Sequence, residues 1–185
     1  MKILIGVTGS VATIKLGELL SELRSRFANV ELKIVVTERG NQFVTLSDLP
    51  ESCYYRDEQE WTSWKQKGDS VLHIELRKWA DLFVICPLSA NTLAKMAVGM
   101  CDNLLTSIVR AWPPNKPLVV CPAMNTCMWE NPLTAQQIKT VQTVYRNCSV
   151  VMPKEMHILA CGDVGPGALA SITDIVDCIQ VNIHV

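Results

Sequence analysis

Short apolar runs alternate with longer amphipathic segments along the whole chain. The runs are rich in Val, Ile and Leu, and they cover Ile3 to Val7, Leu32 to Thr37, Leu82 to Cys86, Leu118 to Cys121 and Val150 to Met152. Apolar runs of this length are typical of parallel strands that are buried on both faces of a sheet. We therefore expect a parallel strand at each of these positions.

The segments between the runs show the spacing of apolar residues that is typical of helices. In chain order they are Val11 to Phe27, Asn91 to Val98, Asn103 to Ala111, Thr134 to Tyr145 and Thr173 to Val181. Strands that alternate with helices build a parallel sheet whose two faces are both covered by helices. The pattern predicts an α/β protein with a Rossmann-like, doubly wound parallel sheet in three α/β/α layers.

One region does not follow this alternation. Pro50 to Asp69 contains Trp61, Trp64 and several charged residues, and we expect an excursion outside the core that serves as a flap or an oligomer contact. The chain of 185 residues shows no internal repeat and no Gly/Ser-rich linker. We expect one domain that spans residues 1–185.

Composition and charge exclude several classes of protein. Hydrophobic residues make up 49% of the chain and charged residues 19%, a balance that excludes a mainly disordered protein. The formal net charge of -1 provides no basic field for nucleic acid, so we expect no such partner. The apolar runs are far shorter than the ~20 residues that cross a bilayer, and the first residues do not resemble a secretory signal. We expect a soluble, cytoplasmic protein without a membrane partner.

The eight cysteines show neither CxxC pairs nor histidines at zinc spacing. A reducing compartment also disfavours disulfides. We therefore expect no metal site, and we expect most of the cysteines to be core residues.

Candidate chemistry gathers where the predicted strands end. In an open parallel sheet, ligands bind beyond the carboxyl ends of the strands. Small, hydroxyl and amide residues follow four of the runs: Gly9, Ser10 and Val11 after the first, Thr37 at the end of the second, Ser89, Ala90, Asn91 and Thr92 after the third, and Ala123, Met124 and Asn125 after the fourth. We expect a polar ligand at this edge of the sheet.

The turn at Gly9 and Ser10 leads from a strand into a helix, whose opening amides favour an anion such as phosphate. The turn has neither the full dinucleotide spacing nor the Walker spacing, so a mononucleotide phosphate is favoured over a pyrophosphate. Purely structural interpretations stay open, because Ser10, Ser89 and Asn125 also suit helix caps and turns.

Two further residues have a structural and a functional interpretation. His73 lies among apolar residues, where a histidine is more often structural, although an imidazole also suits a general base. Cys161 lies in the glycine-rich stretch from Ala160 to Ala168, which is either an ordinary surface loop or a lid whose thiol donates a proton.

Taken together and in their order along the chain, these motifs resemble the flavin-containing cysteine decarboxylases. The motifs are Gly9 to Ala12, Leu72 to Asp81, Pro87 to Leu93, Cys101 to Thr106, Pro122 to Trp129 and Ala160 to Asp163. The match runs from Lys2 to Ala170. It is most similar to members that convert 4′-phosphopantothenoylcysteine to 4′-phosphopantetheine in coenzyme A biosynthesis.

The resemblance implies a homotrimer with FMN between subunits and a substrate pocket that is shared across the interface. It implies that FMN is lined by Gly9, Ser10, Val11, Thr37, Ser89, Ala90, Asn91, Thr92 and Ala123. His73 would then be the base, Asn125 would hold the substrate carboxylate, and Cys161 would be the proton donor. Met124, Ala160 and Leu169 would contact the substrate.

The chemistry gives a reason for the flavin. Direct loss of CO2 from a cysteinyl carboxylate leaves a carbanion without an electron sink. Oxidation of the thiol-bearing carbon to a thioaldehyde places a C=S group β to the carboxylate, so that CO2 can leave as an enethiolate forms. Return of the two electrons then completes a reaction with no net redox change.

Some residues depart from the pattern of the family, and rival functions exist. Ile158 stands where relatives have a basic residue, and Leu169 and Ser171 differ from the usual lid segment, so contacts with the substrate can differ.

One rival is a non-catalytic inhibitor of a protein phosphatase, a type that depends on acidic tails. Another is a peptidyl-cysteine decarboxylase or flavin prenyltransferase on the same scaffold. The combination of His73, Asn125 and Cys161 favours a small-molecule cysteine decarboxylase.

Overall fold

A computed structural model describes residues 1–44, 53–62, 64–159 and 162–183 of the chain. Its main sheet has six strands in the order β3-β2-β1-β4-β5-β6, and every neighbouring pair is parallel. The strands are β1 (Lys2–Val7), β2 (Glu31–Val36), β3 (Tyr54–Tyr55), β4 (Leu82–Leu88), β5 (Leu118–Pro122) and β6 (Cys148–Val150). The strand order reverses beside β1, which therefore lies in the middle of the sheet.

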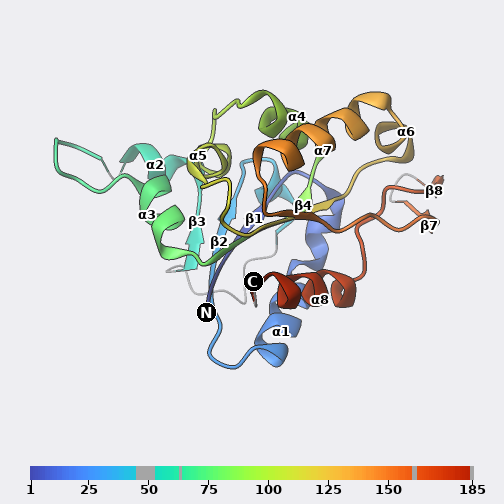
Figure 1. Cartoon of the computed structure of the whole chain (residues 1–185), viewed down its shortest axis with the longest axis horizontal. Coiled ribbons are helices and arrows are strands. Elements are labelled where there is room, and N and C mark those ends of the chain that lie inside the picture. The colour runs from blue at the N-terminus through green and yellow to red at the C-terminus, as the bar shows by residue number, and fades with distance from the viewer. Residues whose placement is uncertain (45–52, 63, 160–161, 184–185) are drawn as a thin grey trace.

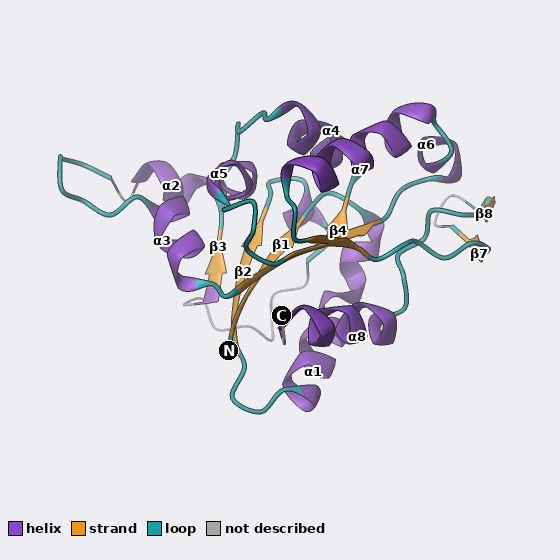
Figure 2. Ribbon diagram, in the orientation of Figure 1, coloured by secondary structure: helices purple, strands orange, loops and turns teal. Residues whose placement is uncertain are grey.

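Helices cover both faces of this sheet, as Figures 1 and 2 show. One face carries α3 (Leu72–Trp79), α4 (Ala90–Val98), α5 (Leu104–Ala111) and α7 (Pro132–Val144), and the other carries α1 (Leu16–Arg26) and α8 (Ile172–Ile183). Shorter helices are the 3-10 helices at Val11–Lys15 and Gly40–Gln42, with α2 (Asp57–Thr62) and α6 (Thr126–Trp129). This arrangement confirms the predicted three-layer α/β/α fold.

Burial on both faces explains the uninterrupted apolar runs. Ile3 and Ile5 of β1 belong to the core cluster that includes residues of α1 and α8, whereas Leu4 belongs to the cluster on the opposite face. All three side chains are fully buried. Because successive strand residues point to opposite faces, a strand between two helix layers needs an apolar residue at every position.

Two predictions about strands need correction. The last strand is Cys148–Val150 rather than Val150 to Met152, and Met152 is exposed. The region from Pro50 to Asp69 is not wholly outside the core, because Tyr54–Tyr55 forms the edge strand β3 beside β2. Residues 50–52 and 63 lie outside the described residues. Trp61 and Trp64 are 76% and 51% exposed, as an excursion from the core would leave them.

Predictions about helices also need refinement. The segment after β1 is a 3-10 helix followed by α1, and the stretch around His73 is the helix α3, which the sequence pattern did not indicate. A small antiparallel hairpin of β7 (His157–Ile158) and β8 (Val164–Gly165) projects from the main body (Figure 1). Within the described ranges, no helix is both long and apolar enough to cross a bilayer.

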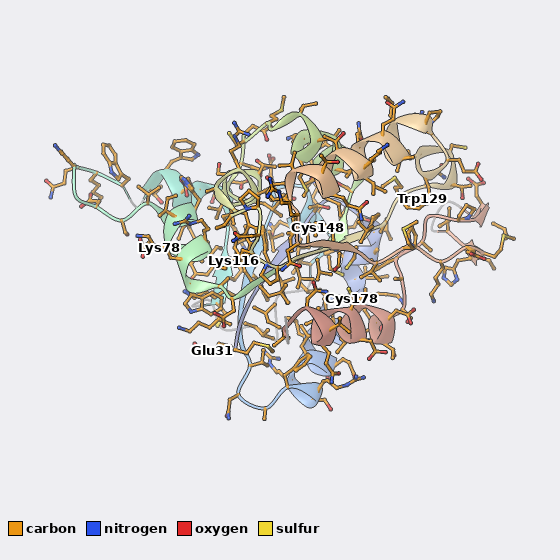
Figure 3. The ribbon with its side chains drawn as sticks, viewed as in Figure 1. Glu31, Lys78, Lys116, Trp129, Cys148 and Cys178 are labelled. Atoms are coloured by element: carbon orange, nitrogen blue, oxygen red, sulfur yellow. The ribbon has the colours of Figure 1, made fainter. Side chains whose placement is uncertain are left out.

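The cysteines are less uniformly buried than expected. Cys86 and Cys121 are in the core, but Cys101 and Cys127 are exposed. Cys148 begins β6 and Cys178 lies on α8 below it, as labelled in Figure 3. Burial raises the pKa of the Cys148 thiol to about 12. A half-buried thiol of this kind remains protonated and chemically inert at neutral pH.

Candidate functional site

A cavity of about 830 Å³ opens where β1, β4 and β5 end. Its lining residues are Gly9, Ser10, Val11, Ala12, Ile14, Lys15, Phe43, Ser89, Ala90, Asn91, Ala123, Met124, Asn125, Met128, Lys154, His157, Ile158, Leu159, Gly167, Ala168 and Leu169. Its volume is in the range of small-molecule sites. The position agrees with the rule that open parallel sheets bind ligands beyond the carboxyl ends of their strands.

A second, more polar cavity of about 460 Å³ adjoins the first and shares Gly9, Ser89 and Asn91 with it. Its other lining residues are Thr37, Glu38, Arg39, Asp57, Thr92, Lys95, Asp102 and Asn103. The nine residues that were predicted to contact the cofactor therefore all line one of two connected cavities. The structure brings these residues together from four different loops.

Thr8 fixes the loop after β1 against the loop after β4. Its buried hydroxyl donates to the Pro87 carbonyl at 2.7 Å and accepts from the Ser89 backbone N–H at 2.8 Å. The Thr13 hydroxyl also donates to the Thr8 carbonyl at 3.1 Å. The peptide bond between Cys86 and Pro87 is cis. Because each buried group has a partner, these bonds hold two of the cavity loops in one geometry.

The two serines at the cavity cap the helical segments that follow them. Ser10 accepts from the Ala12 backbone N–H at 3.3 Å, and its hydroxyl donates to the Ala123 carbonyl at 3.4 Å. Ser89 caps α4 by accepting from the Thr92 N–H at 3.3 Å. The capping interpretation is thus confirmed, and the start of α4 also presents the positive end of a helix dipole to the cavity.

The loop after β2 completes the polar side of the site. The Thr37 hydroxyl donates to the Val7 carbonyl at 3.3 Å and accepts from the Gly40 N–H at 3.1 Å. A Cβ atom at Gly9 would lie only 2.7 Å from the Cβ of Arg39. Glycine at position 9 therefore lets the loops after β1 and β2 approach closely.

Charged groups distinguish the second cavity from the first. The Asp57 carboxylate accepts from the Leu104 backbone N–H at 2.9 Å, but burial is the larger effect and raises the pKa of Asp57. The ammonium group of Lys95 lies 2.6 Å from the Asp102 carboxylate and lowers the pKa of Asp102. This cavity therefore suits the polar portion of a ligand.

The wall of the main cavity that follows β5 is largely apolar. Met124, Met128 and Leu169 line it, and Val11 and Ile14 face the same space from the segment after β1. Leu169 is buried, whereas Ile14 and Met128 are exposed at the opening. An apolar wall opposite hydroxyl and amide groups can accommodate a flat ring that also carries polar substituents.

Asn125 lies at the junction of β5 and α6, where it serves as the helix cap. Its Oδ1 accepts from the Cys127 N–H at 2.8 Å, and its Nδ2 donates to Asp163 Oδ2 at 3.2 Å. Because Oδ1 accepts from the Cys127 N–H, the Nδ2 end of the amide points toward Asp163. The side chain therefore presents a hydrogen-bond donor at the edge of the main cavity.

The glycine-rich segment after β8 packs directly against this asparagine loop. The Met124 N–H donates to the Gly167 carbonyl at 2.9 Å, and the Thr126 hydroxyl donates to the Pro166 carbonyl at 2.8 Å. Gly167 has a φ of +115°, and a Cβ atom there would lie 2.5 Å from the Met124 carbonyl oxygen. Helix α6, on which Figure 3 labels Trp129, lies on the side from which the hairpin projects.

Two predicted residues, Ala160 and Cys161, lie outside the described residues. They belong to the connection between β7 and β8, whose ends are joined by a bond from the Leu159 N–H to the Asp163 carbonyl at 2.8 Å. Leu159 itself lines the main cavity.

His73 lines neither cavity of its own chain. It lies in the first turn of α3, and its Nδ1 atom is 2.5 Å from Oε1 of Glu60. The other carboxylate oxygen of Glu60 accepts from the His73 backbone N–H at 3.0 Å. The sequence neighbours of His73 are apolar, but the structure adds a carboxylate partner from α2, because Glu60 contacts His73 twice.

Sequence reasoning did not assign several of the residues that line the main cavity. Phe43 and Ile14 lie beyond the short loops on which the prediction concentrated, and Met128 is the third residue of α6. Lys154 and His157 line the cavity together with Ile158. Lys154 and His157 are basic residues close to Ile158 in the sequence, and this was the signal that could have assigned them to the cavity.

Comparisons with known proteins agree with this geometry. A protein-family model described as Flavoprotein matches residues 1–184. The chain is 49% identical over 179 residues to the phosphopantothenoylcysteine decarboxylase of Mus musculus, covering 97% of this chain and 85% of that protein. It is similar to the structure of a cysteine-to-serine mutant of PPC decarboxylase complexed with pantothenoylaminoethenethiol, with 43% identity, a TM-score of 0.90 and coverage of 100% and 98% of the two chains. The FMN binding protein AtHal3 is 44% identical, with a TM-score of 0.85 and coverage of 97% and 95%.

Proposed function

The chain belongs to the flavoprotein family, and on this basis we propose that it is an FMN-dependent decarboxylase that converts 4′-phosphopantothenoylcysteine to 4′-phosphopantetheine in coenzyme A biosynthesis. The observation that carries the proposal is the composition of the two connected cavities. Hydroxyl and amide groups gather where β1, β2 and β4 end, and an apolar wall follows β5. A mononucleotide with a flat ring matches both halves.

The residues present fit FMN. Ser10, Ser89 and Thr92 offer hydroxyl groups for the phosphate and the ribityl chain, and the start of α4 favours a negative charge. Val11 and Ala123 offer apolar contact for the ring. When bound, FMN supplies a two-electron acceptor that afterwards returns the electrons, which gives an overall reaction without net oxidation.

The substrate would lie across the wall that follows β5. Asn125 donates a hydrogen bond to the carboxylate in place of its present partner Asp163, and Met124 and Leu169 contact the apolar part of the substrate. Lys154 and His157 line the same cavity, where Lys154 provides positive charge and His157 a ring N–H for the phosphate. They would compensate for Ile158, which stands where relatives have a basic residue.

The reaction needs a base first and an acid later. His73 accepts the proton of the substrate thiol while two electrons and a hydrogen leave the thiol-bearing carbon, so that a thioaldehyde forms. The C–C bond to the carboxylate then breaks, and its electrons pass into the C=S group to give CO2 and an enethiolate. Cys161 donates the proton that accompanies the return of the electrons. The PPC decarboxylase mutant with a serine in place of a cysteine is complexed with pantothenoylaminoethenethiol. An ethenethiol is the compound that would accumulate if the final protonation failed.

The functional unit would be a homotrimer in the cytoplasm, built from chains that each fold as one domain over residues 1–185. The position of His73 supports shared active sites, because it lies away from the main cavity of its own chain. The exposed Trp61 and Trp64 offer apolar surface for a neighbouring subunit. Nucleic acids and membranes are not expected partners.

Anaerobic mixing of the holoenzyme with 4′-phosphopantothenoylcysteine tests the proposed roles. We expect His73→Asn to bind FMN but to leave its visible band unbleached and to release no CO2. We expect Cys161→Ser to bleach the flavin and release CO2, but to accumulate an enethiol that lacks two hydrogens relative to the product, because a serine hydroxyl is a far weaker acid than a thiol. Normal product from Cys161→Ser at nearly the wild-type rate would contradict the role of Cys161. A purified protein that binds no flavin would contradict the proposed function as a whole.

A further inference from the structure

Glu60 and His73 form a contact with two points of attachment. One carboxylate oxygen of Glu60 lies 2.5 Å from Nδ1 of the His73 ring, and the other accepts from the backbone N–H of the same residue at 3.0 Å. The Glu60 side chain is only 8% exposed and that of His73 is 25% exposed. The carboxylate therefore fixes both the backbone and the ring of a single residue in a partly dehydrated place.

The position of Glu60 is itself secured by helix ends. Helix α3 begins after Val71, whose side chain provides no cap, so Glu60 satisfies one of the unpaired N–H groups in the first turn of α3. Three residues earlier on α2, Asp57 accepts from the Leu104 N–H at the start of α5. Helix α2 is thus attached to two other helices, one at each of these carboxylates.

We propose that Glu60 is a positioning residue that selects the tautomer of His73. A carboxylate only accepts hydrogen bonds, so the neutral ring must carry its hydrogen on Nδ1 to bond with Glu60. Nε2 is then left with its lone pair, and it is the atom that takes the proton of the substrate thiol. This inference rests on the proposed role of His73 as the base, and it adds the residue that makes a particular ring nitrogen basic.

Glu60→Gln is the decisive variant because it keeps the shape and reverses the hydrogen bond. The amide oxygen can still accept from the His73 backbone N–H, so the cap of α3 is preserved. The amide NH2 then faces Nδ1 and favours the tautomer with its hydrogen on Nε2. Glu58→Gln removes the same charge from an exposed position on the same helix and is the matched control.

The tautomer can be measured without any turnover. The chain has only three histidines, so 15N NMR of histidine-labelled holoenzyme above neutral pH gives few ring signals, and those of His73 are the ones lost in His73→Asn. We expect hydrogen on Nδ1 in the wild type and in Glu58→Gln, and hydrogen on Nε2 in Glu60→Gln. An unchanged tautomer in Glu60→Gln would overturn the proposal.

Kinetics provide the second measurement. Since a general base contributes about 10²- to 10⁴-fold, we expect Glu60→Gln to lower kcat by roughly 10²-fold or more, with little change in KM. Glu60→Asp keeps a carboxylate acceptor, so it should retain the Nδ1 hydrogen and at least about tenfold more activity than Glu60→Gln. Equal activities of the two Glu60 variants would overturn the proposal. The Glu60→Asp variant also keeps the proposal testable if Glu60→Gln is poorly folded.

His73→Asn separates failure of this inference from failure of the proposed function. If Glu60→Gln is fully active while His73→Asn is inactive, His73 is essential but Glu60 does not position it. If both variants are active, His73 is not the base and the proposed mechanism itself fails. Loss of activity in both, together with the switched tautomer in Glu60→Gln, supports the inference.

Discussion

Replacement of Gly167 by alanine tests the close packing of the glycine-rich segment against the asparagine loop. Gly167 has a φ of +115°, and an added Cβ would lie 2.5 Å from the Met124 carbonyl oxygen. Gly68 has a similar φ of +110°, but a Cβ there would meet nothing within 4 Å. Gly68→Ala is therefore a matched control that shares the backbone strain and lacks the steric clash.

The structure allows the two effects to be separated in magnitude. An L-residue with this backbone conformation costs about 1–2 kcal/mol, and this cost is the upper limit for Gly68→Ala. At Gly167 the clash also forces the chain away from Met124 and breaks the bond from the Met124 N–H to the Gly167 carbonyl, which adds about 0.5–1.5 kcal/mol. We expect Gly167→Ala to lose about 1.5–3.5 kcal/mol in total.

Thermal unfolding of the two variants measures the difference. For a chain of this size, 1 kcal/mol corresponds to about 2–4 °C in Tm, so we expect Gly167→Ala to melt several degrees below Gly68→Ala. Protein and FMN concentrations must be matched, because bound ligand raises Tm by mass action. We also expect a higher KM for Gly167→Ala, since Met124 and Asn125 lie in the displaced loop. Equal Tm values for the two variants would refute the reasoning.

Three further predictions concern other parts of the molecule. Thr8→Val removes the hydroxyl partner of the Pro87 carbonyl and of the Ser89 N–H. We therefore expect a loss of about 2 kcal/mol or more in stability and weaker retention of FMN in gel filtration, and an unchanged Tm would contradict this. At pH 8 we expect iodoacetamide to modify the exposed Cys127 in the native protein, but to modify Cys148, with a pKa of about 12, only after unfolding. Peptide mass spectrometry would show the difference, and equal rates in the native protein would contradict the raised pKa of Cys148. Co-expressed His73→Asn and Cys161→Ser chains should regain part of the activity, because some hybrids of the proposed homotrimer would contain an intact shared site; no recovery in verified hybrids would place both residues in one subunit.

Most of the sheet could be predicted because burial on both faces leaves a clear signal. Strand β1 is apolar at nearly every position, and the predicted and observed strands almost coincide. Strand β3 was missed because it has only two residues, Tyr54 and Tyr55, at the edge of the sheet. The last strand was displaced for a related reason: the residues of β6 are only half-buried, so its apolar pattern is weak.

The cavity residues could be predicted because the ends of parallel strands meet at one edge of a sheet. Ser10, Ser89 and Asn125 are far apart in sequence, yet strand order alone brings them to one cavity. The partner of His73 could not be predicted in this way. Glu60 lies on a short helix outside the strand pattern, and no spacing rule connects the end of α2 with the start of α3. Such contacts depend on how the connecting segments fold back.

The central position of β1 has a consequence for synthesis of the protein on the ribosome. Lys2 at its start bonds to Asp81, which is 79 positions later in the chain, and Ile3 pairs with Leu82 of β4. At about 5–20 residues per second, β4 is made roughly 4–16 s after β1. During this interval the largely apolar strand β1 has β2 as its only available sheet neighbour, because β4 does not yet exist. The newborn chain must therefore keep this strand from aggregating before its second neighbour arrives.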